Sequence, residues 1–383
     1  MTVANSLNKI IYADNAATTK IDDDALNLMF DLQKNFFANP SSSCKISRPL
    51  KKILKESREK IAACINAEPH EIFFTSGGTE SDNWAIKSLV LKNLREQPNI
   101  ITSAVEHKAI LNSCAAMKNL GCSVTILPVD KFGFVNPADL QKKILPQTKI
   151  ISIMLANNEV GTIQPVESLA EISHAAGKIF HTDAVQAVGH IPVDVKILRA
   201  DMLSASAHKF NGPKGVGFLF VRDGLKIPPL IDGGGQEFFS RAGTENFPAI
   251  AAMALALENN CRDMKSTADK ISACSNILLE RLKKNHAEFI LNGSQNRSPG
   301  HLSLSFKNFD GETLLHRLDL KNICVATGSA CNSNQQKISH VLQAINVDKN
   351  FIRGTIRITF GKNNSLVDAK KIADALIEIL SPK

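Results

Sequence analysis

The sequence predicts an α/β protein in which a large domain with a mainly parallel sheet is joined to a smaller α+β domain. Three observations predict it. The N-terminal part alternates short apolar strands with helical segments, a long helical segment follows, and strands of alternating polarity come after it. At 383 residues, usual domain sizes also favour one large and one smaller domain. We place the boundary near residue 258, with residues 14–258 in the large domain and residues 259–383, joined by 1–13, in the small one.

Seven short apolar runs predict the strands of the large domain. They cover residues 72–75, 99–103, 123–127, 150–155, 178–182, 202–205 and 217–221. Each run is followed by turn residues or by a helical pattern, which is typical of a mostly parallel sheet.

The C-terminal part begins with apolar residues spaced by three and four over residues 246–285, which predicts a long helix. We expect this helix to bridge the two domains. Residues 302–306 and 355–360 alternate in polarity like strands, and residues 365–380 have the pattern of a final amphipathic helix.

Composition excludes several classes of protein. With 44% hydrophobic and 21% charged residues, the chain is typical of a globular enzyme and not of a disordered or repeat protein. The apolar run 247–257 is shorter than the roughly 20 residues that cross a bilayer, so no membrane span is expected. The first residues lack the order of a secretory signal, and we therefore expect a cytoplasmic protein.

The distribution of charged residues and of cysteines argues against further classes of function. The net charge is +8, but basic residues come in pairs such as Lys51-Lys52 and Lys142-Lys143 and never in a long block. This pattern favours solvated helix faces over a nucleic-acid-binding surface. The eight cysteines show neither a CxxC pair nor the spacing of metal ligands, so we expect no disulfide framework and no metal site.

A glycine-rich turn follows the first predicted strand. The segment Thr75-Ser-Gly-Gly-Thr-Glu-Ser-Asp82 passes two glycines and opens a helix with a Thr-x-x-Asp capping pattern. Free backbone N–H groups and the helix dipole favour an anion there, and glycine lets a phosphate approach closely. Taken alone, the segment fits an ordinary capped turn equally well.

Two further strands end in residues that suit pyridoxal phosphate. Asp183 follows one strand, and Ser206-Ala-His-Lys209 follows another, so both sites lie at the sheet edge where open parallel sheets bind ligands. Lysine forms the covalent link to this cofactor, and the acid keeps its pyridine nitrogen protonated. A lone Asp or Lys in a loop is usually only solvated. Asp183 and Lys209 therefore indicate a cofactor site only in combination with the glycine-rich turn, which would bind the phosphate.

His107 and Cys331 are the remaining candidates. His107 follows a strand at the same edge and titrates near neutrality, although an ordinary histidine fits the sequence there as well. Cys331 lies in a run of small and polar residues, which predicts a loop. A nucleophile that must move between a substrate and an acceptor suits such a loop. Cys324, in contrast, lies in an apolar stretch and is expected in a strand.

Short motifs recur in a fixed order from residue 12 to about residue 361. They are Tyr12-Ala-Asp-Asn-Ala-Ala-Thr-Thr, Asn39-Pro-Ser-Ser, Thr75-Ser-Gly-Gly-Thr-Glu-Ser-Asp-Asn, Val105-Glu-His-Lys, Ala156-Asn-Asn-Glu-Val-Gly, His181-Thr-Asp-Ala-Val-Gln, Ser206-Ala-His-Lys, Arg241-Ala-Gly-Thr-Glu-Asn and Gly328-Ser-Ala-Cys. In this combination the chain resembles the cysteine desulfurases of the class V aminotransferase family, in the subgroup with a long catalytic loop. The resemblance implies a type I pyridoxal-phosphate-dependent transferase fold, a homodimer and pyridoxal 5'-phosphate bound in the large domain.

The resemblance also implies roles for residues at matching positions. Lys209 would hold the cofactor covalently, Asp183 would pair with the pyridinium, and His107 would stack on the ring and move protons. Gln186 would bond the phenolic oxygen. The phosphate would be held by Gly78, Thr79, Ser206 and His208, with Thr244 from the partner subunit.

The substrate side is implied in the same way. Asn158 would support the ring or the substrate carboxylate, and Arg357 would clamp that carboxylate with two parallel hydrogen bonds. Cys331 would attack the sulfur of L-cysteine, leaving L-alanine and an enzyme persulfide. The sulfur would pass to an acceptor protein, either for iron–sulfur cluster assembly or for tRNA or cofactor thiolation. Another enzyme of this fold, an aminotransferase or a selenocysteine lyase, is the alternative; a transaminase needs no loop cysteine.

Three departures from the family pattern are visible. Cys44 stands where histidine is frequent, and Phe238-Phe239 stand where arginine and glycine are usual. Lys337-Ile-Ser339 replaces a more typical Glu-Pro-Ser, so acceptor docking is expected to differ. No function is assigned to Cys44.

Overall fold

The computed structural model describes residues 10–327 and 338–381. The predicted nucleophile Cys331 lies outside the described residues, as do the other residues from 328 onward of the run 326–336 that was predicted as its loop. The first two residues of that run, Ala326–Thr327, form a strand. No helix in the described ranges combines the length and the apolar character that a membrane span requires.

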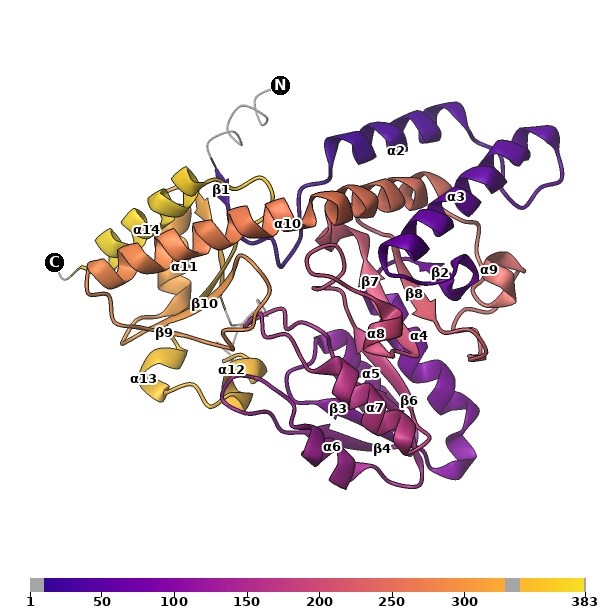
Figure 1. The fold of residues 1–383 in the computed structure, drawn as a ribbon, viewed down its shortest axis with the longest axis horizontal. Helices are drawn as coiled ribbons and strands as arrows, with labels where there is room; N and C mark the ends of the chain where they lie inside the picture. Colours follow the sequence, from indigo (N-terminus) through magenta and orange to yellow (C-terminus); the bar gives the residue numbers. More distant parts are fainter. Residues whose placement is uncertain (1–9, 328–337, 382–383) are drawn as a thin grey trace.

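A seven-stranded sheet forms the centre of the larger part of the described chain (Figure 1). Its order is β2-β8-β7-β6-β5-β3-β4. The strands are β2 Ile72–Thr75, β3 Asn99–Ser103, β4 Ser123–Leu127, β5 Thr148–Ser152, β6 Ile179–Asp183, β7 Met202–Ser206 and β8 Gly217–Val221. Strands β7 to β4 are parallel, and only β8 runs antiparallel to its neighbours β2 and β7. The predicted mainly parallel sheet is therefore confirmed.

Three of the seven predicted strands differ in their bounds, β6 by one residue at each end, β7 by one residue at one end and β5 by more. We predicted residues 150–155, but β5 ends at Ser152. The chain continues beside β6, because the Ile153 amide donates to the His181 carbonyl at 3.1 Å. The next amide, of Met154, donates instead to the buried carboxyl group of Glu106 at 3.0 and 3.1 Å. A side chain thus replaces a neighbouring strand as the hydrogen-bond acceptor, and the regular β-ladder ends at this point.

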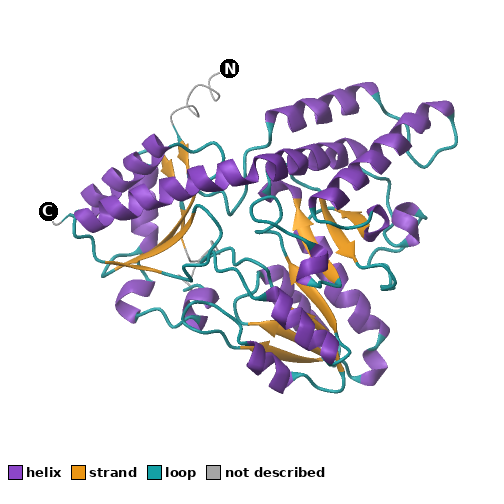
Figure 2. Ribbon diagram, in the orientation of Figure 1, coloured by secondary structure: helices purple, strands orange, loops and turns teal. Residues whose placement is uncertain are grey.

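Helices cover both faces of the sheet, as Figure 2 shows. Within the described ranges they are α2 Asp23–Asn35, α3 Arg48–Cys64, α4 Gly78–Lys92, α5 Lys108–Lys118, α6 Pro137–Lys143, α7 Val166–Ala175, α8 Val195–Leu198 and α9 Gln236–Phe239. Successive strand residues point to opposite faces. Accordingly Ile100 packs in the core with α4 and α5, whereas Ile101 packs in the core with α3, α6 and α7.

Helices α2 and α3 were not predicted from the sequence. Both have clear start signals: Asp22 caps α2 by accepting from the amides of Asp24 and Ala25, and Pro49 lies in the first turn of α3. Their packing partner is distant in sequence, because both lie along the N-terminal half of α10 (Figure 1).

The smaller part contains a four-stranded antiparallel sheet with the order β12-β13-β10-β9. Its elements are β9 Phe289–Leu291, β10 His301–Phe306, β12 Ala326–Thr327 and β13 Thr355–Thr359, with helices α11 Gly311–Asp319, α12 His340–Ala344, α13 Lys349–Ile352 and α14 Leu366–Leu380. A parallel pair joins β1 Ile11–Tyr12 to β11 Ile323–Cys324. Ala13 lies in the same core as β10 and α14. The placement of residues 1–13 with the C-terminal part stays a proposal, which the packing of residues 11–13 supports.

Helix α10, Phe247–Lys284, connects the two parts, as predicted for residues 246–285. Phe247 and Leu257 pack in the core of the large sheet, whereas Ile271 and Leu278 pack in the core of the small one. One continuous helix therefore contributes to both hydrophobic cores.

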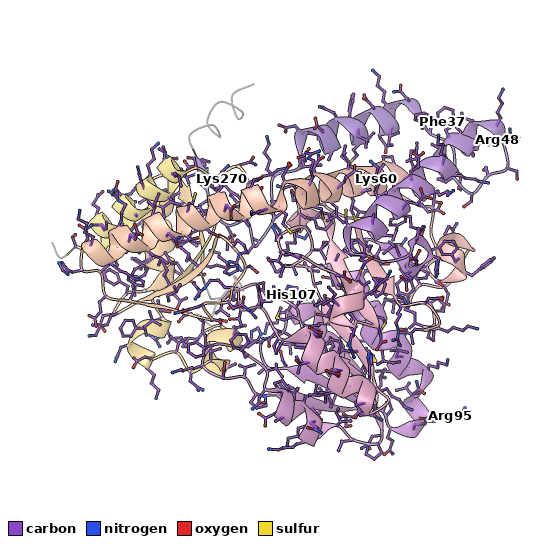
Figure 3. The ribbon with its side chains drawn as sticks, viewed as in Figure 1. Phe37, Arg48, Lys60, Arg95, His107 and Lys270 are labelled. Carbon is purple, nitrogen blue, oxygen red and sulfur yellow. The ribbon has the colours of Figure 1, made fainter. Side chains whose placement is uncertain are left out.

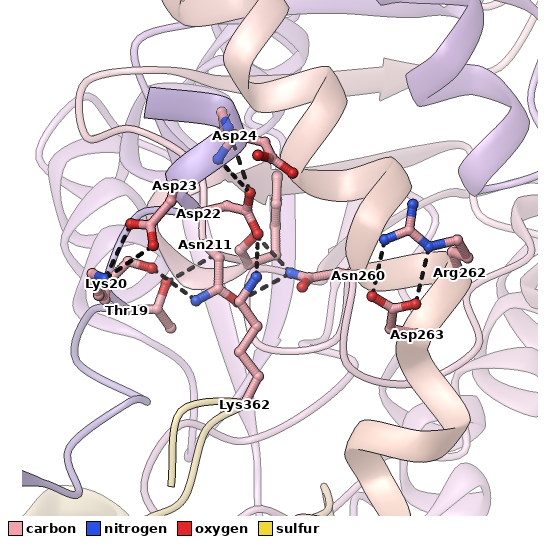
Figure 4. Close-up of polar contacts among 12 residues, drawn as sticks. Thr19, Lys20, Asp22, Asp23, Asp24, Asn211, Asn260, Arg262, Asp263 and Lys362 are labelled. Carbon is pink, nitrogen blue, oxygen red and sulfur yellow. Dashed lines mark hydrogen bonds and ion pairs between the residues drawn. The ribbon is translucent and has the colours of Figure 1, made fainter. Parts of the chain in front are cut away.

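Polar contacts secure the junction between the parts (Figure 4). Lys362, in the loop after β13, forms an ion pair with Asp22 at the start of α2. The Asn211 side chain donates to the Lys20 carbonyl at 2.8 Å, and the Asn260 side chain of α10 donates to the Phe210 carbonyl at 2.6 Å. These contacts tie α2, α10 and the C-terminal sheet together beside the site described next.

Candidate active site

A cavity of about 670 Å³ opens at the carboxyl ends of the parallel strands, where the two parts meet. Figure 3 shows His107 in this central position. Its lining contains residues predicted as a functional set from the sequence: Gly78, Thr79, His107, Asn158, Asp183, Gln186, Ser206, His208, Lys209 and Arg357. These residues come from five separate segments of the large part and from β13, and residues 16–18 add a sixth segment of the large part to the lining.

Lys209 ends a short 3-10 turn, Ala207–Lys209, directly after β7. Its Nζ donates to the carbonyls of Ala16 and Ala17 at 2.6 and 2.8 Å. Burial, followed by the nearby positive charge of Arg357, lowers the pKa of Lys209 to about 8. An amine with this pKa is partly neutral near physiological pH, which is the state required of a nucleophile.

Asp183 is the last residue of β6 and is buried. Its Oδ1 accepts from the amide of Val185 at 2.9 Å. Burial raises the pKa of Asp183, while His107, the Val185 amide and Lys209 oppose that rise. The carboxylate therefore suits a cationic partner in the cavity, since such a partner would stabilise its ionised form.

His107 caps the N-terminus of α5. Its Nδ1 accepts from the amide of Ala109 at 3.1 Å, and from this bond we assign the proton of the neutral ring to Nε2. Burial, and then the positive charges of Lys209 and Lys108, lower the pKa of His107 against the opposing effect of Asp183. The ring is thus neutral near pH 7, and Nε2 is the nitrogen free to exchange a proton.

The glycine turn before α4 forms the predicted anion seat, but its capping differs from the prediction. We predicted a Thr79-x-x-Asp82 cap; instead α4 starts at Gly78, Gly77 is the cap residue with φ 149°, and no side chain caps the helix in the described chain. A Cβ on Gly78 would lie 2.6 Å from Val185 Cγ2. Asp82 points inward because it is buried. The uncapped first turn leaves backbone N–H groups available for an anion.

Ser206 and His208 flank this seat. Ser206 is buried at the end of β7, and the Nδ1 of His208 hydrogen-bonds with Thr18 Oγ1 at 3.1 Å. Burial, followed by Lys209 and Lys214, lowers the pKa of His208 to about 4, so the ring is neutral. Lys214 also lines the cavity, and sequence reasoning missed it. The glycine after it, Gly215, was the available signal of a turn that returns to the site.

Arg357 of β13 is part of the cavity lining and comes from the smaller part of the chain. Its Nη1 donates to the Asn158 carbonyl at 2.8 Å, and its Nη2 donates to Asp14 Oδ1 at 2.6 Å. Its Nε is buried and has no hydrogen-bond partner within the described ranges. Part of the guanidinium is therefore held by the protein, and an unsatisfied N–H remains. Asp14 was inside a quoted motif, but no role had been given to it.

Thr244 does not line the cavity of its own chain and is exposed. Close to it, Arg241 donates to both carboxylate oxygens of Glu80 at 2.8 and 3.0 Å. Burial opposes ionisation of Glu80, but hydrogen bonds from Arg241 and Ser76 outweigh it and lower the pKa of Glu80. The ion pair fixes the loop that carries Thr244 against the first turn of α4.

Phe238 and Phe239 also lie away from the cavity, 58% and 84% exposed. They follow Glu237, and all three have positive φ values, an uncommon conformation for such residues. The buried Glu237 carboxylate accepts from Arg58 at 2.8 and 2.9 Å, which holds the turn in place. These two departures from the family pattern therefore alter an outer loop and not the cavity wall.

Known proteins resemble the chain over nearly its whole length. Residues 11–372 match the family described as Aminotransferase class-V. The chain is 42% identical over 373 residues to "Cysteine desulfurase IscS" of Methanosarcina thermophila, covering 97% of this chain and 92% of the relative. A solved structure named "NIFS-LIKE PROTEIN" is 37% identical with a TM-score of 0.91, covering 97% and 99% of the two chains. Another, "SspA in complex with cysteine", is 34% identical with a TM-score of 0.82, covering 92% and 99%.

Proposed function

This chain belongs to the class V aminotransferase family and is a cysteine desulfurase, and from that premise we propose that its cavity binds pyridoxal phosphate and L-cysteine and that Cys331 accepts the sulfur. The observation that carries the proposal is the meeting of Lys209, Asp183 and His107 in one cavity. An aminotransferase or a selenocysteine lyase was the alternative reading; the names of the similar proteins favour the desulfurase.

The cavity residues fit pyridoxal phosphate. A Cβ on Gly78 would clash with Val185, so only glycine fits this close approach, and the uncapped turn around it suits a phosphate. Lys209, with a pKa of about 8, would hold the aldehyde carbon, and Asp183 would face the pyridine nitrogen. Gln186, Ser206 and His208 would contribute further hydrogen bonds to the group, with Thr79 at the phosphate and Thr244 supplied by a second subunit. When bound, the group supplies an electron sink for bonds at the substrate Cα.

On the substrate side, Arg357 would orient the cysteine carboxylate. The buried Nε–H has no partner within the described chain, and a carboxylate would satisfy it. Asp14 and the Asn158 carbonyl hold the rest of the guanidinium, so its direction is fixed before substrate arrives. Asn158 lines the cavity next to Arg357, and its side chain would assist.

Proton movement would involve His107 and Lys209. Because Nδ1 of His107 accepts from the Ala109 amide, its Nε2 is the site that exchanges a proton with the substrate. Burial and the neighbouring charges lower the pKa of His107, which keeps it neutral at working pH. Burial and the positive charge of Arg357 lower the pKa of Lys209 in the empty site to about 8, and an amine of this kind would be suited to take and return a proton at the Cα.

Cys331 would complete the reaction as the nucleophile. Its thiolate would attack the substrate sulfur and the Cβ–S bond would break. The sulfur would stay on Cys331 as a persulfide, and the carbon fragment would take up a proton at Cβ and leave as alanine. A homodimer, a cytoplasmic location and an acceptor protein for iron–sulfur cluster assembly or thiolation are further parts of the proposal. Direct binding of nucleic acid or of a membrane is not part of it.

Product analysis tests the function. We expect the purified protein, given L-cysteine and a reducing thiol, to release alanine and sulfide in equal amounts. Formation of an oxo acid in place of alanine would indicate an aminotransferase. A parallel incubation with selenocysteine would identify a selenocysteine lyase if only that substrate reacted.

A further inference from the structure

Asp82 of α4 has no role in the function proposed above, although it borders the cavity. Its side chain is 1% exposed, and its Oδ1 has no hydrogen-bond partner within the described ranges. A buried carboxyl oxygen without a partner is costly when it is charged. The residue therefore needs either a proton or a counter-charge.

Titratable groups surround Asp82 on several elements. An oxygen of Asp82, an oxygen of Asp183 and a ring nitrogen of His107 all lie within 4.8 Å of one another. Glu106 adds a further acidic group. On β6, the Nε2 of His181 is 3.8 Å from Asp82 Oδ1.

His181 is not the counter-charge that Asp82 would need. Its ring hydrogen-bonds with Ser152 at Nδ1, at 2.8 Å, and with Ser204 at Nε2, at 2.9 Å. Burial lowers the pKa of His181 to about 3, so it is neutral. Asp82 thus faces acids and a neutral ring.

The two neighbouring carboxyls differ in what surrounds them. Burial raises the pKa of Asp183, but the hydrogen bond from the Val185 amide and the positive charge of Lys209 favour its ionised form. At Asp82, burial and then the negative charge of Asp183 oppose ionisation, and only a hydrogen bond with Ser204 favours it. Two carboxylates this close in a dry site do not both ionise readily, so one proton goes to the less supported group.

We propose that Asp82 is a positioning residue that carries the proton of the Asp82–Asp183 pair, so that Asp183 alone bears the negative charge facing the cavity. This inference rests on the proposed function, which requires an ionised Asp183 opposite the pyridine nitrogen. A proton on Asp82 removes the repulsion between the two carboxyls without moving Asp183 from the end of β6.

Infrared spectroscopy of the holoenzyme tests the proton directly. In the wild type at neutral pH, we expect a carbonyl band of a protonated carboxylic acid that shifts when aspartate is labelled with carbon-13. The label separates Asp82 from Glu106, whose pKa burial raises to about 8 and which gives its own acid band. The aspartate band should vanish in Asp82→Asn and remain in Glu106→Gln. Absence of a label-sensitive acid band in the wild type would overturn the proposal without any substitution.

A second readout is the pH midpoint of the colour change of the bound cofactor. Asp82→Asn replaces one neutral group by another, so the midpoint should move by less than about 0.3 pH unit. If Asp82 were ionised in the wild type, Asp82→Asn would remove a negative charge close to the cofactor and would move the midpoint by roughly one pH unit or more. A shift of that size would contradict the proposal. Alanine release from cysteine is measured separately. If the wild-type protein releases no alanine, the proposed function is refuted, and the infrared band still shows whether Asp82 is protonated.

Discussion

The cofactor side of the cavity is built from neighbouring strand ends, whereas the proposed substrate side joins segments far apart in the chain. Asp183 and Ser206 are the last residues of β6 and β7, adjacent parallel strands. Arg357 meets Asp14 and Asn158 across 343 and 199 positions of sequence. The first side depends on one sheet, and the second depends on how the two parts of the molecule meet.

Loss of Lys209 should have the largest effect, because it removes both cofactor attachment and proton transfer. We expect Lys209→Ala to form no covalent bond to the cofactor and to lose about a thousandfold or more in alanine release. Borohydride reduction and peptide mapping of the wild type should mark Lys209. Label on another lysine would contradict the assignment of the cofactor side.

Loss of Cys331 should abolish turnover and spare the cofactor. Sulfur transfer needs a nucleophile, and thiolate attacks sulfur readily. We expect Cys331→Ala to fold, bind cofactor and respond in colour to added cysteine, yet to form no persulfide and to release alanine about a thousandfold more slowly.

Cys324→Ala is the matched control for Cys331. Cys324 lies in β11, where burial raises the pKa of its thiol and pairing with β1 holds its backbone. This variant should keep full activity. Full activity in Cys331→Ala, or a loss confined to Cys324→Ala, would refute the proposed sulfur relay.

Arg357→Lys should weaken cysteine use by about ten- to a hundredfold, because lysine keeps the charge but loses the planar pair of donors. The loss should appear in KM, with cofactor affinity little changed. Equilibrium binding of cofactor to the apoprotein provides the control. If cofactor affinity falls instead, Arg357 is a structural residue and the substrate carboxylate binds elsewhere.

The contrast between the two sides also explains what the sequence could predict. Lys209 and Asp183 were found because strand periodicity and turn residues are local signals that place side chains at a known sheet edge. Asp14 and Lys214 were missed because their positions depend on packing between distant segments. The cap predicted from Thr79 and Asp82 was wrong for a similar reason: burial of Asp82 beside β6 and β7 outweighed its local preference for a helix terminus.

The smallest predicted effect connects the two sides through charge. Neutral Lys209 is the form that attaches the cofactor, and its pKa in the empty site is about 8. The rate of cofactor attachment to apoprotein should therefore rise roughly fivefold from pH 7 to 8 and less than twofold from pH 8 to 9. A lysine with an ordinary pKa near 10.4 would instead gain about tenfold in each step.

Arg357 should set part of this midpoint. After burial, its positive charge is the second cause that lowers the pKa of Lys209, so its removal favours the protonated amine. In Arg357→Gln the attachment profile should move to higher pH, by a few tenths of a unit to about one unit. At pH 7 the variant then attaches cofactor more slowly, and above pH 9 its rate approaches that of the wild type. Stopped-flow absorbance across this pH range measures both curves, with Arg357→Lys as the control that keeps the charge and should keep the midpoint. An unchanged midpoint in Arg357→Gln would show that burial alone sets the pKa of Lys209 and that the two sides of the cavity act independently.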